Sequence, residues 1–372
     1  MRARSATFFS LFFCLLTLGP GSEASAGMHA YGGDDAIDEI AVHAVYYLAK
    51  DDSPLPDWRE RISYLLDRIE RFHQRELGGQ SVMKASLLSE PFIASATRGG
   101  FPQEDANSFF FHMMDEIQAS GRVQLATDAF PILLVMADMN FCPGYDDWTR
   151  ACDETQCICP DHSACAGYVN DQGEDYPGTC CGGARAVYWP ARHRGLGLVT
   201  ADGWRVPLRG SDCVVYHEGI GHSIGLPHPD PINNSVMGLA QYVGYLHESW
   251  MDEDQKQAMG WQPEPIDQDG LFSQFHVRHL PLAPKAGETV WLEARWPQRF
   301  DAEQVKAAVQ GNLREPFASL GEPAINKDGD ETRARWRLPA VALGEARAYR
   351  VSLQTRSGET EELWGYLRVR SE

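Results

Sequence analysis

The chain has 372 residues, with 33 Lys or Arg against 52 Asp or Glu, and carries a formal net charge of −19 at pH 7. This acidic balance excludes nucleic acid as a partner, because no basic surplus exists to neutralise phosphates. A hydrophobic content of 43% is enough for packed cores, and the length predicts two domains.

Residues 1–26 have the organisation of a secretory signal peptide. Arg2 and Arg4 form a positive start, residues 8–18 an apolar run, and residues 24–26 an A-x-A cleavage site. The apolar run is about eleven residues long, whereas a membrane span needs roughly twenty. No later segment is a candidate span. We therefore predict a protein secreted to the extracellular space or a periplasm.

The next part of the chain alternates strand and helix patterns. In chain order the sequence predicts a strand over 37–48, a helix capped by Asp57 and ended by Gly78, a strand over 81–89, a helix over 102–120, a strand over 130–139, and short strands over 186–189 and 197–200. This alternation predicts an α/β (α+β) domain with a mixed twisted sheet over residues 27–262.

Nine cysteines are present, and Cys14 lies in the predicted signal peptide, which leaves eight in the mature chain. An even number of cysteines in a secreted protein predicts four disulfides, with the pairing open. Seven of the eight fall in a Cys-rich insertion over 142–181 that is also rich in Pro and Gly. The eight are Cys142, Cys152, Cys157, Cys159, Cys165, Cys180, Cys181 and Cys213.

The insertion also contains two weaker metal-binding patterns. A structural zinc site of Cys157, Cys159, His162 and Cys165 is disfavoured, because no standard C-x2-C spacing is present. The acidic group Asp171, Glu174 and Asp175 could hold Ca²⁺, although a solvated acidic loop is the simpler interpretation.

Composition changes after Trp261. Residues 262–265, with two prolines, form a predicted linker, and the following segments alternate apolar with polar residues between turn signals. This pattern predicts an all-β sandwich of immunoglobulin or fibronectin type over residues 268–372. Its predicted strands cover 274–280, 289–296, 333–338, 347–355 and 363–369.

The chemistry-bearing motif is HEGIGHSIGLPH, residues 217–228. Because His217 and His222 are five residues apart, a regular α-helix would separate them by about 140° around its axis. A single π-turn, with about 4.4 residues per turn, returns five residues to nearly the same face. Gly219 and Gly221 lie inside this interval and tolerate a distorted backbone. We therefore predict a π-turn that places both imidazoles on one side.

The residues after His222 complete the pattern. Gly225 is placed to end the helix in a sharp turn, which lets His228 return to the same metal, and Met237 follows nine residues later. The pattern resembles the metzincin clan of zinc endopeptidases, with its H-E-x-x-H-x-x-G-x-x-H and Met-turn. The resemblance covers roughly residues 36–262 and is specific over 217–237. The extra residue departs from the clan and is similar to H-E-x-x-G-H in the dipeptidyl peptidase III family.

The resemblance implies a metzincin-like domain in which His217, His222 and His228 hold one catalytic Zn²⁺ and Glu218 is the general base. Met237 would form the Met-turn below the metal. A second interpretation keeps a regular helix, so that Glu218, His222 and His228 ligate the metal and activity is poor.

The favoured function is a secreted zinc endopeptidase that cleaves a protein or peptide substrate. The alternatives are a non-catalytic secreted binding protein with a structural or degenerate zinc site, and a zinc amidase acting on a non-protein substrate. Tyr242 and Tyr245 follow Met237, and packing is favoured over hydrogen bonding to an oxyanion for both. The sequence indicates no oligomeric state.

Overall fold

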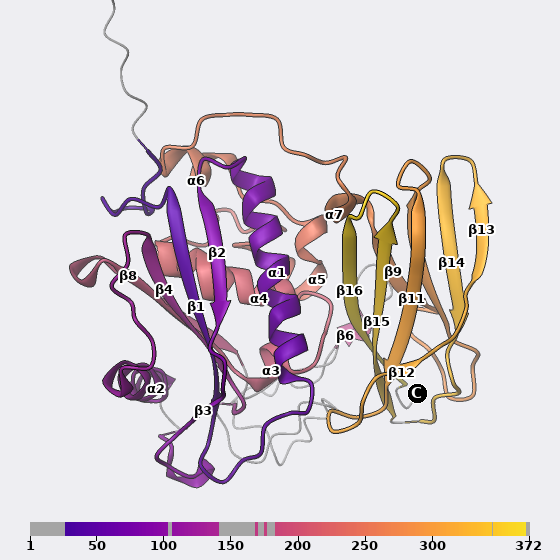
Figure 1. Cartoon of the computed structure of the whole chain (residues 1–372), viewed down its shortest axis with the longest axis horizontal. Helices are drawn as coiled ribbons and strands as arrows, with labels where there is room; N and C mark the ends of the chain where they lie inside the picture. Colours follow the sequence, from indigo (N-terminus) through magenta and orange to yellow (C-terminus); the bar gives the residue numbers. More distant parts are fainter. Residues whose placement is uncertain are drawn as a thin grey trace, which may run out of the picture.

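The computed structural model describes residues 27–102, 106–140, 168–169, 175–176, 183–343 and 345–369. Two parts lie side by side in Figure 1: an N-terminal unit (residues 27–261) built around a mixed sheet, and a C-terminal unit (residues 262–369) of antiparallel strands. Helix α1 lies between the mixed sheet and the C-terminal unit. Among the described residues, no helix has the length and apolar character of a membrane span.

The N-terminal unit follows the predicted alternation. Its elements are β1 (Glu39–Leu48), α1 (Trp58–Leu77), β2 (Val82–Leu87), β3 (Phe92–Ile93), η1 (Arg98–Gly100), α2 (Ala106–Ser120), β4 (Phe130–Ala137), β5 (Tyr168–Val169), β6 (Asp175–Tyr176), β7 (Ala184–Trp189), η3 (Pro190–Arg192), β8 (Arg194–Val199), α3 (Ala201–Trp204), α4 (Ser211–Tyr216), η4 (His217–Gly221), η5 (His222–Ile224), α5 (Ala240–Val243), η6 (Leu246–Glu248) and α6 (Glu253–Ala258).

The predicted mixed sheet is confirmed. Its strand order is β2-β1-β4-β8-β7, with β3 also pairing with β1, and only β7 runs antiparallel to its neighbour. Strand β4 is buried along its whole length, as its continuous apolar sequence requires, because helices cover both faces of the sheet. Helix α1 and the histidine motif pack on one face, and α2 packs on the other.

Helix α1 is amphipathic as predicted, but its start differs from the prediction. The Asp57 side chain makes no capping hydrogen bond. Its Oδ2 instead accepts a hydrogen bond from Nη2 of Arg61 at 2.7 Å, so the carboxylate pairs with a buried guanidinium one turn away. Gly78 ends the helix in the left-handed conformation with φ 57°, as expected for a C-cap glycine.

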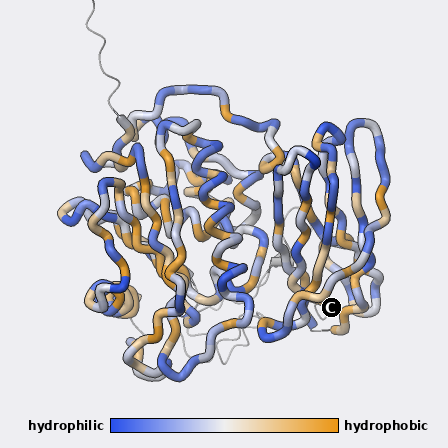
Figure 2. The backbone as a smooth tube through the Cα atoms, viewed as in Figure 1, coloured by the Kyte–Doolittle hydropathy of each residue, from blue (hydrophilic) through white to orange (hydrophobic). Residues whose placement is uncertain are grey.

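The C-terminal unit begins with α7 (Leu271–Gln274) and contains two four-stranded antiparallel sheets. Both sheets contribute to one core, in which Leu292 and Trp296 of one sheet meet Val351 and Leu363 of the other. Figure 2 shows apolar residues interspersed with polar ones along these strands. The predicted all-β character is confirmed. The strands are β9 (His276–Leu280), β10 (Trp291–Pro297), β11 (Ala302–Gln310), β12 (Ala318–Ser319), β13 (Ala324–Asp328), β14 (Glu331–Arg337), β15 (Ala346–Thr355) and β16 (Thr360–Arg368).

Most of the cysteine predictions fall outside the described residues, as do the signal peptide, the candidate zinc knuckle, Asp171 and Glu174. Asp175 is described only as backbone of β6. Cys213 is described, and it is a buried free thiol whose Sγ donates to the carbonyl of Gly244 at 3.6 Å. The prediction that all eight cysteines form disulfides is therefore wrong for Cys213, which is a free thiol in the core.

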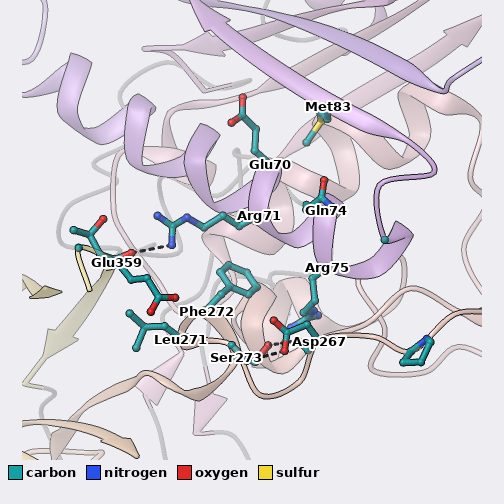
Figure 3. Close-up of a pocket in the computed structure, with 15 residues that line it drawn as sticks. Glu70, Arg71, Gln74, Arg75, Met83, Asp267, Leu271, Phe272, Ser273 and Glu359 are labelled. Carbon is teal, nitrogen blue, oxygen red and sulfur yellow. Dashed lines mark hydrogen bonds between the residues drawn. The ribbon is translucent and has the colours of Figure 1, made fainter. Parts of the chain in front are cut away.

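The two units meet along α1. The rings of Tyr64 and Trp364 stack with centroids 5.1 Å apart, and the backbone N–H of Trp364 donates to the Tyr64 hydroxyl at 3.1 Å. Farther along α1, a cavity of about 810 Å³ opens between this helix, residues 265–273 and the β15–β16 turn. Figure 3 shows Arg71 reaching from α1 toward that turn, where it donates to the carbonyl of Thr360 at 2.9 Å. No member of the histidine motif lines this cavity.

Candidate active site

The histidine motif changes helix type at the position where the sequence has its extra residue. Helix α4 ends at Tyr216, η4 is a π-helical turn, and η5 is a short 3-10 turn. Gly225 then ends the run with φ 87°, a conformation that residues with side chains rarely adopt. The predicted π-turn and the predicted sharp turn at Gly225 are confirmed.

The π-turn brings three imidazoles together. The Nε2 atom of His217 lies 3.0 Å from that of His222 and 3.1 Å from that of His228, and the last two are 3.2 Å apart. Three nitrogens bound to zinc at the usual 2.0–2.1 Å in a tetrahedral site would be about 3.3–3.4 Å apart. The spacing of this three-histidine cluster (His217, His222 and His228) therefore fits one zinc ion closely.

Hydrogen bonds to the opposite ring nitrogens assign the tautomers of His217 and His222. Nδ1 of His217 donates to the carbonyl of Val236 at 2.9 Å, and Nδ1 of His222 donates to the carbonyl of Leu226 at 2.7 Å. Burial, together with His222 and His228, lowers the pKa of His217 to about 3, so this ring is neutral near pH 7.

A neutral ring that donates through Nδ1 has a lone pair on Nε2. Two such lone pairs therefore face each other across 3.0 Å, with no proton between the nitrogens of His217 and His222. A shared cation would stabilise this arrangement, and carbonyl acceptors on the remote nitrogens are typical of metal-binding histidines.

Glu218 lies beside the cluster but does not belong to it. The groups that converge to ligand distance are His217, His222 and His228, which does not match the alternative in which Glu218 replaces His217. Burial raises the pKa of Glu218, while the charges of His228 and of Arg185 in β7 lower it. The carboxyl group is thus partly desolvated and within electrostatic reach of both residues. No local pattern in the sequence indicated this position for Arg185.

Met237 packs against the π-turn. Its side chain is fully buried, and a Cβ atom on Gly221 would clash with its Sδ atom. Asp252 holds the segment before it by accepting hydrogen bonds from Ser235 Oγ at 2.7 Å and from Asn233 Nδ2 at 2.8 Å. The turn that carries Met237 also supplies the Val236 carbonyl that orients His217.

The two tyrosines after Met237 have different environments. Tyr245 is buried in the core of the C-terminal unit, as the packing prediction requires. Tyr242 is 44% exposed, and burial of its hydroxyl together with the charge of Glu218 raises its pKa. The prediction that Tyr242 serves only in packing therefore does not account for its environment, because its side chain is partly exposed and interacts electrostatically with Glu218.

A second group at metal-ligand distance lies where the two units meet. This interfacial cluster consists of His247, Glu248 and His276. Nε2 of His247 is 3.3 Å from Nδ1 of His276, and Glu248 Oε1 lies 3.8 Å from both nitrogens. His247 and His276 are 29 residues apart in sequence, so no sequence motif contains both.

The interfacial cluster does not fit a metal ion. Nη2 of Arg68 lies 2.9 Å from Nδ1 of His247, and a guanidinium can only donate. Because Nδ1 must accept, the neutral His247 ring has its proton on Nε2, which donates to His276 instead of binding a metal. Burial lowers the pKa of His247 well below its ordinary value and keeps the ring neutral.

Comparisons with known proteins show only weak similarity to this chain. No family model matches the sequence, and no curated protein is similar to it. The chain is similar to the crystal structure of wild-type OgpA from Akkermansia muciniphila, with 10% identity and a TM-score of 0.31 over 95% of this chain and 97% of that one.

Catalytically inactive OgpA from the same organism, in complex with an O-glycopeptide substrate, gives 9% identity and a TM-score of 0.33 over 91% and 95% of the two chains. Astrotactin-2, a vertebrate-specific membrane protein, gives 11% identity and a TM-score of 0.21 over 28% and 24%. These values are too low to establish a shared fold, so the function is argued from the site itself.

Proposed function

We propose that this chain is a secreted zinc-dependent endopeptidase of metzincin type, in which His217, His222 and His228 hold the metal through Nε2. The observation that carries the proposal is the pair of Nε2 lone pairs facing each other across 3.0 Å, imposed by the carbonyl acceptors on Nδ1. Secretion is supported by the signal-peptide pattern of residues 1–26.

Glu218 is the proposed general base. Zn²⁺ in such a site supplies Lewis-acid polarisation of a carbonyl group and makes water acidic enough to react near neutral pH. The buried Glu218 carboxyl, with its raised pKa, suits transfer of a proton from water to the leaving amine. Tyr242 and Arg185, both within electrostatic reach of Glu218, are candidates for hydrogen bonding to the substrate.

The sheet supports a peptide as the substrate. Strand β7 is the last strand of the mixed sheet, so one of its edges is paired with no other strand among the described residues. This strand also packs against η4 and η5, which carry Glu218 and two of the histidines. An extended peptide can hydrogen-bond to such an edge as an additional strand, which would place its backbone beside the zinc site.

The test compares wild-type protein with Glu218→Gln on an unstructured protein substrate such as casein. We expect Glu218→Gln to retain one zinc per chain and to lose activity by a factor of about 10² to 10⁴, the usual contribution of a general acid–base group. Glu253→Gln, at an exposed position on α6, is the matched control and should be fully active. Unchanged cleavage by zinc-loaded Glu218→Gln would overturn the mechanism.

A further inference from the structure

A single buried arginine connects the C-terminal unit to the helix that carries the active site. Arg68 on α1 is fully buried and binds three elements. Its Nε is 3.1 Å from Asp212 Oδ2 on α4, its Nη1 is 2.9 Å from Glu361 Oε1 on β16, and its Nη2 is 2.9 Å from Nδ1 of His247 on η6. One guanidinium therefore joins the C-terminal unit, the active-site helix and the segment that follows Met237.

Asp212 fixes the start of the active-site helix. It lies in the first turn of α4, where a carboxylate interacts favourably with the helix dipole. Besides Arg68, its carboxylate accepts hydrogen bonds from the backbone N–H of Cys213 at 2.9 Å and of Leu246 at 3.2 Å. The same helix continues without interruption into η4, which begins at His217. A movement of Asp212 would therefore move the backbone of the helix from which His217 and Glu218 project.

Glu361 completes the charge balance of this network. Its Oε2 accepts a hydrogen bond from Nη1 of Arg71 at 2.9 Å, so two arginines face the two carboxylates of Asp212 and Glu361. Burial alone would lower the pKa of Arg68, but Asp212 and Glu361 raise it above its ordinary value and keep it charged. Removal of the Glu361 carboxylate leaves Asp212 as the carboxylate partner of Arg68, and the buried groups around the guanidinium must adjust.

We infer that Glu361 is a positioning residue for the active site, which acts through Arg68 and Asp212 on the helix that carries His217 and Glu218. The C-terminal unit is then part of the scaffold of the zinc site and not a separate attachment module. This inference rests on the proposed function where it is tested by kcat. The test by zinc affinity does not require the protein to be active.

The same interface provides a matched control. Nη1 of Arg350 on β15 pairs with Glu60 Oε2 on α1 at 2.8 Å, and the half-buried guanidinium also lies over the rings of Phe317 and Trp364. This pair also links the C-terminal unit to α1, but neither partner bonds to α4. Arg350→Gln therefore weakens the interface without breaking the connection to Asp212.

The experiment measures zinc affinity by chelator competition, and kcat and KM on casein, for full-length wild-type protein, Glu361→Gln and Arg350→Gln. We expect Glu361→Gln to weaken zinc binding about 3- to 30-fold and to lower kcat by a similar factor, as is usual for coupling through a packed network. KM should stay within about twofold, because β7 is untouched. Arg350→Gln should stay within about twofold in every parameter.

Asp212→Asn cuts the same connection without altering the C-terminal unit, and it replaces Glu361→Gln if that variant does not fold. It should reproduce the losses in zinc affinity and kcat. The inference is overturned if either variant folds and keeps the wild-type zinc affinity. If wild-type protein binds zinc but cleaves no substrate, the proposed function fails while the zinc-affinity comparison still decides the role of Glu361.

Discussion

The three-histidine cluster and the interfacial cluster have similar dimensions and different chemistry. Their potential ligand atoms lie 3.0–3.2 Å apart in the first and 3.3–3.8 Å apart in the second. In the first, Nδ1 of His217 donates to a carbonyl, which leaves Nε2 free to bind a metal. In the second, Nδ1 of His247 accepts from Arg68, which places the proton on Nε2.

The difference shows that spacing alone does not define a metal site. The hydrogen-bond partner of the remote nitrogen selects the tautomer, and the tautomer decides whether the near nitrogen can be a ligand. In the three-histidine cluster, carbonyl oxygens accept from Nδ1 of His217 and His222 and so leave their Nε2 atoms able to bind a cation. In the interfacial cluster, the buried guanidinium of Arg68 donates to His247, which therefore belongs to a hydrogen-bonded network that joins the two units.

The largest expected effect on stability comes from removing the guanidinium of Arg68, which donates to His247 of the interfacial cluster. Arg68→Met leaves the buried carboxylates of Asp212 and Glu361 without their shared cation. We expect the free energy of unfolding, measured by denaturant titration, to fall by about 3–5 kcal/mol. Arg350→Met, which removes the pair with Glu60 and the cation–π contacts with Phe317 and Trp364, should cost less than about 2 kcal/mol. Equal losses in the two variants would contradict the assignment of Arg68 as the central cation.

A smaller effect is expected from filling the space beneath the π-turn. Gly221→Ala places a Cβ atom against Sδ of Met237, and overpacking of this kind costs about 1–3 kcal/mol. Gly99→Ala is the control, since nothing lies within 4 Å of a Cβ at that position. Thermal unfolding would measure both variants. If Gly221→Ala were as stable as the control, Met237 would not pack beneath the helix as described.

The smallest effect is a change in acid sensitivity at the interfacial cluster. Because burial lowers the pKa of His247, its neutral form stabilises the fold above the unfolded pKa of about 6.5, and this stabilisation is lost as the pH falls below that value. We expect His247→Gln to reduce the slope of unfolding free energy against pH by up to about 1.4 kcal/mol per unit between pH 6.5 and 4.5. An unchanged slope would show that His247 is not buried in its neutral form.

Local sequence patterns predict those parts of the structure in which the interacting residues are close in sequence. The three ligands of the proposed zinc site lie within twelve residues, so the spacing of His217, His222 and His228 together with Gly225 predicted both the π-turn and the convergence of the rings. Strand β4 was predicted because a continuous apolar run of that length is typical of a strand buried on both faces.

The remaining features depend on distant parts of the chain. Strand β11 reads AEQVKAAVQ, which is rich in helix-forming residues, and its pairing with β15 about 45 residues later overrides that preference. Arg68 lies 179 residues before His247 and 293 before Glu361, so no local pattern could indicate their network. The even number of cysteines predicts a disulfide for Cys213, whereas the structure shows it as a free thiol in the core, because cysteine parity carries no information on which cysteines lie close together.

The most direct test of the central claim is the zinc content of the purified full-length chain after dialysis against a weak chelator. We predict one zinc per chain in wild-type protein and in His247→Gln, and none in His222→Ala. Absence of zinc from wild-type protein, or its retention by His222→Ala, would contradict the assignment of the three-histidine cluster. Two zinc ions per chain, with one lost in His247→Gln, would contradict the distinction between the two clusters.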